Sequence, residues 1–291
     1  NLTNNEYYQN NISRDTTLDQ NQNFISNTKK YQSQFLFKEP INKKWGLNIE
    51  HLFKINIANQ NRSTTNKDLS NNEYSILDSL FSNNFENFKL TNRAGLYFIY
   101  RNKKDRLKIG GYLRNVQLKS FDDMKNPLTD PLDFWDILPQ LNFRHKFNNS
   151  QRLRFSYRTN SRQPSLNQLQ PVQNNSNPNT IIEGNPDLIP DYSHKLSLRY
   201  NHWKGLSGSY IWSSIDHRIV SNPFSNEVSF DNYGRKISKT VNIESSTNQF
   251  SSFNLGGKVP LGNSFLGLNI RNFSSYNVTN LSLIHISEHT R

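Results

Sequence analysis

A two-residue period of hydropathy recurs along most of this chain. In Arg152–Arg158, the side chains of Leu153, Phe155 and Tyr157 alternate with arginine and serine. A β-strand points successive side chains to opposite faces, so this segment has one apolar face and one polar face. The same pattern predicts ten strands in an all-β fold, and helical spacing fits none of them: Lys30–Lys38, Trp45–Arg62, Phe85–Arg101, Arg106–Phe121, Phe134–Phe147, Gln151–Ser161, Asp191–Asn201, Gly205–Val220, Arg235–Lys258 and Ser264–Tyr276.

The connections between these segments alternate in length. The short ones are rich in Asn, Lys, Gly and Pro, as tight hairpins require: Glu39–Lys44, Asn102–Asp105, Asn148–Ser150, Asn201–Gly205 and Pro260–Asn263. The long ones are the start up to Lys29, Ser63–Asn84, Asp122–Asp133, Arg162–Pro190 and Ser221–Gly234. In an up-and-down meander all short turns emerge at one end, an asymmetry typical of outer-membrane barrels. We therefore predict an antiparallel up-and-down transmembrane β-barrel, with residues 1–280 supplying about ten strands of a larger barrel.

The low hydropathy of the chain is compatible both with a soluble β protein and with an outer-membrane barrel. The mean hydropathy is −0.82 and 33% of residues are hydrophobic. No run approaches 18 apolar residues, which excludes a helical membrane span but not a barrel, whose strands face a polar lumen at every second position. The 12% aromatic content accompanying a net charge of +12 favours ordered β structure over disorder. The absence of cysteine rules out disulfides and thiolate metal sites. Residues 1–11 lack the basic-then-apolar order of an export signal, so we expect the natural N-terminus to lie upstream.

Aromatic side chains cluster beside the turns. Those near the short turns are Trp45, Phe98, Tyr100, Phe147 and Trp203, and those near a long loop are Phe134 and Trp135. Amphipathic rings concentrate at the two interfaces of a membrane, so we interpret the two groups as girdles. The alternative for any single residue is the ordinary preference of aromatic side chains for strands.

The longest internal loop carries a motif in two parts. Arg162–Pro171 leaves a predicted strand at Pro164, and Gly184–Asp191 turns at Gly-Asn-Pro and begins the next strand after Pro190. These segments resemble an "R-x-P-S-x-x-x-L" strand exit and a "G-N-P-x-L-x-P-E" re-entry found in the barrels of TonB-dependent receptors. The accompanying "Q-L-x-P" and "N-S-N-P" are similar to an outer-membrane β-barrel family of Bacteroidetes. This chain has Asp191 where that family usually has Glu, which is a mild chemical change.

The resemblance implies a transporter that binds a scarce nutrient and imports it across the outer membrane of a Gram-negative bacterium. It also implies three kinds of partner: an N-terminal plug domain, the TonB system, and an unknown small ligand. Outer-membrane lipid and lipopolysaccharide would surround the wall. The alternatives are a non-energised barrel acting as a porin, adhesin or assembly component, and a soluble secreted β-sandwich that binds a ligand.

Catalytic chemistry has no support in the sequence. We find no Walker loop, G-x-S-x-G or G-x-G-x-x-G pattern, and we expect no enzyme activity and no cofactor. The histidines show no metal-ligand spacing, and we interpret them as scattered surface or lumen residues: His51, His145, His194, His202, His217, His285 and His289. Calcium favours carboxylate oxygens, but two prolines interrupt the carboxylates of one long loop, which we interpret as solvated: Asp122, Asp123, Asp130, Asp133 and Asp136.

Basic residues gather on the polar face of two predicted strands: Arg152, Arg154, Arg158, Lys195 and Arg199. A basic lumen could attract anionic ligands, or these residues could pair with acidic groups of a plug or of neighbouring strands. No compact motif concentrates the charge, so we expect no nucleic-acid partner. The sequence assigns no ligand-binding residue. Residues 281–291 look like translated sequencing-adapter read-through, and we expect this tail to be non-native; finding it encoded in intact DNA would refute that expectation.

Overall fold

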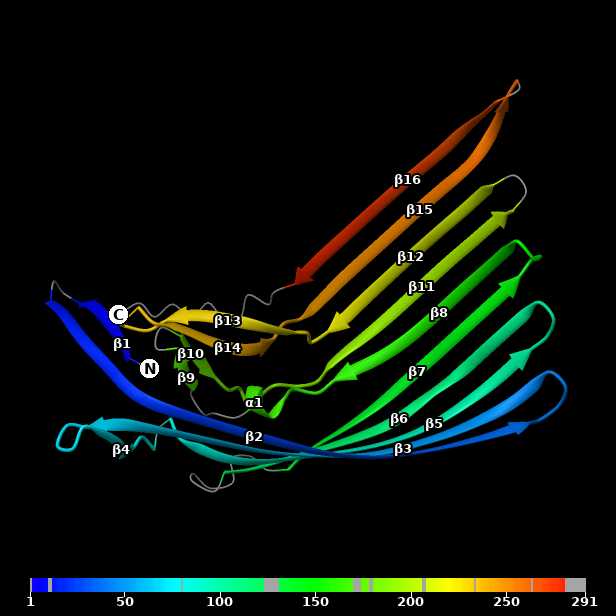
Figure 1. The fold of residues 1–291 in the computed structure, drawn as a ribbon. Helices are drawn as coiled ribbons and strands as arrows, with labels where there is room; N and C mark the ends of the chain where they lie inside the picture. The colour runs from blue at the N-terminus through cyan, green and yellow to red at the C-terminus, as the bar shows by residue number, and fades with distance from the viewer. Residues whose placement is uncertain are drawn as a thin grey trace.

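The computed structural model describes residues 2–9, 12–79, 81–122, 131–169, 174–177, 180–205, 208–232, 234–262 and 264–280. One antiparallel sheet dominates it, with strand order β1-β2-β3-β5-β6-β7-β8-β11-β12-β15-β16 and β4 paired to β3 (Figure 1). Its strands are β1 (Leu2–Gln9), β2 (Ile12–Pro40), β3 (Trp45–Asp68), β4 (Glu73–Leu77), β5 (Asn83–Arg101), β6 (Asp105–Asp122), β7 (Leu132–Lys146), β8 (Gln151–Arg162), β11 (Asp191–Lys204), β12 (Ser209–Ser221), β15 (Ser245–Leu261) and β16 (Ser264–Asn280).

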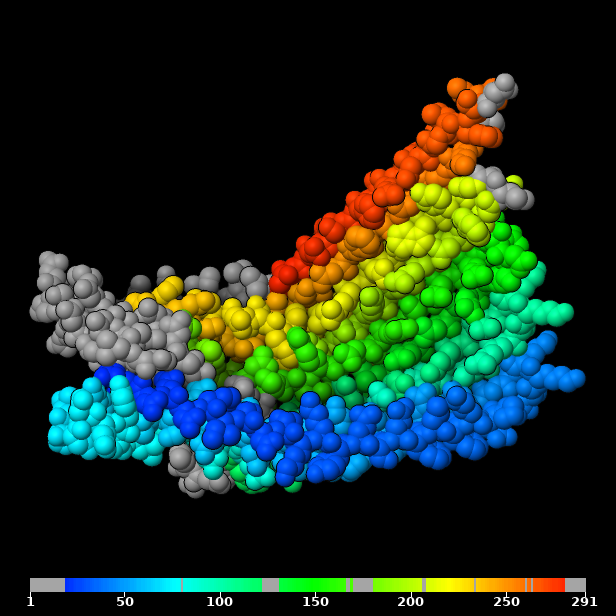
Figure 2. Space-filling view, viewed as in Figure 1, coloured from blue at the N-terminus to red at the C-terminus, as the bar shows by residue number. Residues whose placement is uncertain are grey.

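The main sheet is a curved wall. Its order begins at β1 and ends at β16, so the described strands form a trough and not a closed ring. The space-filling view shows the hollow side of this trough (Figure 2). Nine of the ten predicted strands are present in the predicted up-and-down order, and the tenth, Arg235–Lys258, contributes to the wall only through β15; this order confirms the fold class. Among the described residues no helix is long and apolar enough to cross a bilayer.

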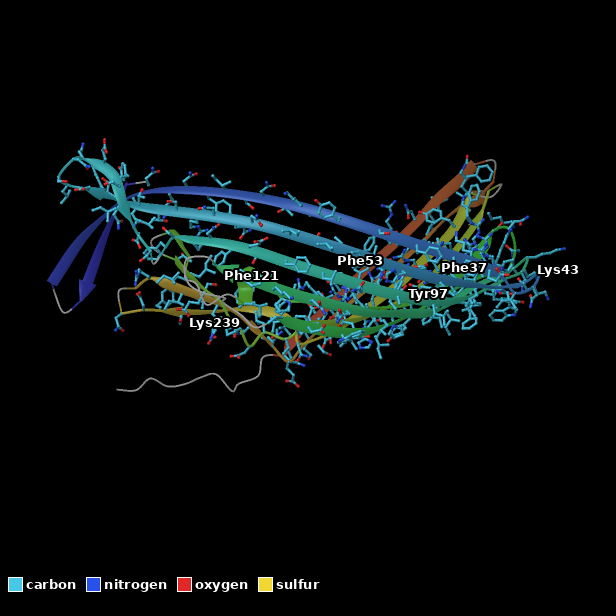
Figure 3. The ribbon with its side chains drawn as sticks, turned by 90° about the horizontal axis from the view of Figure 1, so that it is seen from below. Phe37, Lys43, Phe53, Tyr97, Phe121 and Lys239 are labelled. Atoms are coloured by element: carbon cyan, nitrogen blue, oxygen red, sulfur yellow. The ribbon has the colours of Figure 1, made fainter. Side chains whose placement is uncertain are left out.

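The two ends of the wall differ as predicted. Lys43, in the short turn between β2 and β3, lies at one end, whereas Phe121 and Lys239 lie toward the other (Figure 3). Asn42 shapes this turn, because its Oδ1 accepts the backbone N–H groups of Lys44 and Trp45 at 2.9 and 3.0 Å. Such local acceptance by Asn is typical of tight turns. We call the two ends the short-turn end and the long-loop end.

The strands continue much further toward the long-loop end than predicted. β2 has 29 residues and β3 has 24, and the two pair from Pro40 opposite Gly46 to Gln20 opposite Asn66. The expectation that the start up to Lys29 and Ser63–Asn84 are loops was therefore wrong in part. A strand crosses a bilayer in roughly 9–11 residues. Beyond that length both faces meet water, so the extension has no reason to show apolar alternation.

A second, smaller sheet occupies the trough at the long-loop end. Its order is β13-β14-β10-β9, with β10 parallel to β14 and the other pairs antiparallel. Three of its strands and the one short helix come from the predicted long loops: α1 (Leu166–Leu169), β9 (Asn174–Asn177), β10 (Thr180–Glu183) and β13 (Phe224–Phe230). Its fourth strand, β14 (Lys236–Asn242), comes from a predicted strand. The prediction of one continuous strand over Arg235–Lys258 was wrong, because β14 belongs to the small sheet and β15 to the wall.

A small apolar cluster joins the two sheets. Leu169 of α1 and Leu188 pack against Val116 and Leu118 of β6, and all four are at most 4% exposed. Leu132, Phe134 and Phe224 pack around them. Burial of these side chains holds the loop segments against the wall. The tail predicted to be non-native, residues 281–291, lies outside the described residues.

Candidate functional site: the lumen face of the wall

Alternation divides the wall into two faces. On β7, Trp135 and Ile137 are 65% and 72% exposed, whereas Asp136 and Leu138 are buried. The buried pair lies on the same face as Val116 and Leu118, against which the loop segments pack. We call this the lumen face and the opposite one the outer face. Successive strand residues must alternate between them.

The outer face carries apolar side chains that lie opposite one another on neighbouring strands. The pairs include Ile49 with Leu96, Leu113 with Ile137, and Leu198 with Ile215. All six side chains are at least 39% exposed in the isolated chain. An apolar band of this extent is unfavourable in water and favourable against lipid chains.

Two of the predicted girdle residues, Trp45 and Tyr100, have the placement that a girdle requires. They lie opposite each other on the outer face at the short-turn end, with ring centroids 4.9 Å apart. The interpretation was wrong for Trp203, which shares the lumen face with Arg199 because both occupy odd positions of β11. It was also wrong for Phe134, which packs against the lumen-face cluster, whereas Trp135 does point outward.

A buried ion pair connects the wall to the motif loop. Arg114 on β6 lies directly opposite Asp136 on β7, and its Nη2 and Nε donate to the carboxylate Oδ2 at 2.6 and 3.0 Å. Arg114 also donates to the backbone carbonyl of Ser161, and the side-chain amide of Gln163 donates to Asp136. Gln163 belongs to the motif, so the pair fixes the point at which the chain leaves β8.

The two parts of the motif meet across β8 and β11. The carboxylate of Asp191, 5% exposed, accepts the backbone N–H of Arg162 at 3.0 Å and its Nε at 2.9 Å. The guanidinium of Arg162 also lies over the Phe224 ring of β13. Asn185 donates from its side-chain amide to the backbone carbonyl of Thr240 on β14. The motif is therefore structural: it closes the base of the loop and binds it to the small sheet.

A second polar cluster lies on the same face toward the short-turn end. The hydroxyl of Tyr112 donates to Glu50 Oε2 at 2.8 Å, and Lys108 Nζ is 3.5 Å from Glu50 Oε1. Lys108 also lies 3.6 Å from the ring centroid of Tyr97, which is fully buried. The guanidinium of Arg93 covers the Tyr112 ring at 4.2 Å. Charges above aromatic faces and a satisfied carboxylate give this part of the lumen a fixed polar surface.

The basic residues predicted on the polar face are there. Arg154 lies opposite Arg199, and Arg158 lies opposite Lys195, all on the lumen face. Asp216 on β12 is 3.9 Å from Lys195 Nζ and 3.7 Å from Arg199 Nη2, which supports the pairing alternative for these two cations. Further arginines on this face were not predicted there, among them Arg101, Arg106 and Arg144. Each occupies a polar position of a predicted strand, but only the register aligns them.

The candidate metal ligands are dispersed. His145 Nδ1 is 2.6 Å from Asp105 Oδ1, and His194 Nδ1 is 2.9 Å from the Tyr157 hydroxyl. Asp133 and Asp136 lie in β7 and not in a solvated loop, with Asp133 bonded to Asn115 and Asp136 to Arg114. The described residues contain no group of three or more His, Asp or Glu that could hold a metal ion. Asp123, Asp130, His285 and His289 lie outside the described residues.

Polar contacts at the long-loop end order the hairpin of β3 and β4, beyond the membrane-spanning part of the wall. The Tyr74 hydroxyl donates to Asp19 Oδ1 at 2.7 Å, and this hydrogen bond raises the pKa of the Tyr74 phenol. In the turn before β4, the hydroxyl and the backbone N–H of Ser70 donate to Asp68. These two bonds lower the pKa of the Asp68 carboxyl.

Comparison with known proteins agrees with this architecture. The copper transporter OprC superposes with a TM-score of 0.57 at 11% identity, over 89% of this chain and 39% of that one. The FrpB iron transporter from Neisseria meningitidis gives a TM-score of 0.52 at 10% identity, over 93% of this chain and 38% of that one. The chain thus spans about two fifths of either structure. No curated protein matches the sequence. The model of the outer membrane protein beta-barrel family matches residues 1–286, and the chain belongs to that family.

Proposed function

We propose that this chain is part of the wall of a TonB-dependent receptor-like transporter, which binds a nutrient ligand and imports it across the outer membrane. The motif at Arg162–Asp191 supports this proposal, together with the fold shared with a copper transporter and an iron transporter. The fuller form of the motif further suggests the Bacteroidetes branch of the family. We also propose the partners implied by the resemblance: a plug domain, TonB, and lipopolysaccharide around the strands.

One structural observation carries the proposal. The motif loop is bound to the lumen face through Gln163 and Asp136, and the small sheet that it joins lies inside the trough. A cavity of about 360 Å³ lies between this loop and the small sheet, lined by Arg162, Gln163, Ser165, Gln168, Phe224, Ser225, Asn226 and Thr240. Loop segments held over the lumen can gather a ligand at the entrance of a passage, whereas loops directed away from the wall could not.

The chemistry of such a transporter is binding followed by gated passage, without covalent change to the ligand. The polar clusters at Arg114–Asp136 and Glu50–Tyr112 would provide a fixed hydrogen-bonding surface along the path. The energy would come from the TonB system. The outer face would be held in lipid by its apolar pairs.

The test uses the complete gene product that contains this chain. We expect the purified protein to bind the periplasmic domain of TonB in isothermal titration calorimetry. In planar lipid bilayers it should show no steady potassium chloride conductance, because a plug fills a barrel of this class. Steady conductance without TonB binding would instead establish a non-energised porin-like barrel. A product that is recovered without detergent would exclude both.

A further inference from the structure

Five arginines form a row across the wall near the short-turn end. In the register of the sheet, Arg101 on β5 lies directly opposite Arg106 on β6, and Arg106 lies opposite Arg144 on β7. Arg144 in turn lies opposite Arg154 on β8, and Arg154 opposite Arg199 on β11. All five are on the lumen face. We call them the arginine row.

A row of this kind is unfavourable by itself. Residues directly opposite each other on paired strands have Cβ atoms about 5 Å apart, and like charges at that distance destabilise the pair. The repulsion on Arg199 is reduced by Asp216, whose Oδ1 is 3.7 Å from Arg199 Nη2. In the part of the chain that the structure describes, no carboxylate forms an ion pair with Arg101, Arg106, Arg144 or Arg154. Arg114, eight residues from Arg106 on β6, shows the contrast, because it has Asp136 opposite.

The middle of the row opens into a pocket of about 250 Å³. Six of its seven lining residues are cationic and the seventh is Asn102: Lys103, Lys104, Arg106, Arg144, Lys146 and Arg152. The nearest carboxylate along the chain, Asp105, does not line the pocket and is already bonded to two neighbouring side chains. Its Oδ1 is 2.6 Å from His145 Nδ1, and its Oδ2 accepts the side-chain amide of Asn102 at 2.8 Å. The pocket therefore collects donors and positive charge without a carboxylate in its lining.

The donor set defines the chemical class of the ligand. Guanidinium groups bind phosphate and carboxylate oxygens through paired N–H donors, and ammonium groups add compact positive charge. An anion with several negative charges is needed to neutralise this many clustered cations. The volume of the pocket limits that anion to a small molecule. We propose that this pocket binds a small multivalent oxyanion, bearing phosphate or carboxylate groups, at the short-turn end of the lumen. The site does not depend on the proposed transport, because it requires only the wall strands and one turn.

The test measures pyrophosphate binding to the full chain in non-ionic detergent by isothermal titration calorimetry at low ionic strength. The pocket variant is the double substitution Arg106→Gln and Arg144→Gln. The control is Lys30→Gln and Lys54→Gln, which removes the same charge from the lumen face of β2 and β3, away from the pocket. We expect affinity to fall by about tenfold or more in the pocket variant, since charge-assisted hydrogen bonds are lost. The control should keep the affinity within about twofold, because its two lysines lie away from the pocket and the interaction between charges in water weakens with distance.

Thermal unfolding followed by circular dichroism gives a second measurement. Pyrophosphate should raise the unfolding midpoint of the unsubstituted chain and of the control, but not that of the pocket variant. Without pyrophosphate, the pocket variant should unfold at the same temperature or higher, since a repulsion has been removed. If that variant lacks the β-sheet spectrum, Arg152→Gln at the pocket replaces it in both measurements. Equal weakening in pocket variant and control, or no binding by the unsubstituted chain, would overturn the proposal. Binding of polyglutamate but not pyrophosphate would also overturn it, and would identify an acidic protein segment as the occupant.

Discussion

Arg114 and Asp136 face each other across β6 and β7, with 2.6 Å between Nη2 and Oδ2, and both side chains are largely buried. Their position explains how a polar lumen can be rigid. The same carboxylate oxygen holds the side chain of Gln163, so one ion pair fixes both the wall and the base of the motif loop. Four consequences of the structure can be measured.

Asp136→Asn should destabilise the wall. The substitution leaves the Arg114 guanidinium buried without its counter-charge, and breaking a buried pair in this way costs about 3–5 kcal/mol. We expect a lower midpoint of thermal unfolding in detergent, measured as the temperature at which the β-sheet circular dichroism signal is lost. The double change Arg114→Leu and Asp136→Leu should recover much of this loss, since no charge remains buried. An unchanged midpoint in Asp136→Asn would contradict the role of the pair.

Asp191→Ala should release the motif loop. The change removes the buried acceptor of the Arg162 backbone N–H, and an unsatisfied donor there costs about 1–3 kcal/mol. Limited proteolysis should therefore cut the segment between Arg162 and position 191 faster than in the unsubstituted chain. Asp191→Glu is the matched control, since it keeps the carboxylate, and it should leave the cleavage rate close to normal. Equal cleavage in all three proteins would show that Asp191 does not close the loop.

Gly95→Ala should disturb the lumen face through a steric contact. A Cβ at Gly95 would lie 2.6 Å from the ring of Tyr112, which is itself held by Glu50 and covered by Arg93. Overpacking of this kind costs about 1–3 kcal/mol, and thermal unfolding should report it. Gly267→Ala is the control, because no atom lies within 4 Å of an added Cβ there. A loss of similar size in both variants would remove the steric explanation.

Ile49→Lys should impair insertion into lipid. Ile49 lies on the outer face four residues along β3 from the girdle residue Trp45, which places it near the middle of an apolar band about 25 Å tall. A lysine facing lipid at that depth costs about 2–4 kcal/mol. The yield of folded chain in lipid vesicles, read from heat-modifiable mobility on gels, should fall. Gln34→Lys on the lumen face of β2 is the control, and a fall of the same size there would contradict the two-faced wall.

The sequence by itself determined most of the wall strands and the alternation of their two faces. Leu153, Phe155 and Tyr157 alternate with polar residues because side chains that face the membrane are apolar, whereas those that face the lumen are polar. The alternation of short and long connections then implied the meander, since every second connection of a meander lies at the same end. These signals are local, so no knowledge of neighbouring strands was needed. They also placed Arg154 and Arg199 on the polar face correctly.

Only the tertiary structure decided which strands pair with each other and which side chains are in contact. The alternation in Arg235–Lys258 could not show that β14 leaves the wall for a second sheet, because a period of two does not identify the partner strand. The Arg114–Asp136 pair and the arginine row depend on the register between strands. That register cannot be read from the distance between two residues along the sequence. The extension of β2 toward Ile12 was hidden for another reason: outside the membrane both faces of a strand meet water, and no apolar pattern is required.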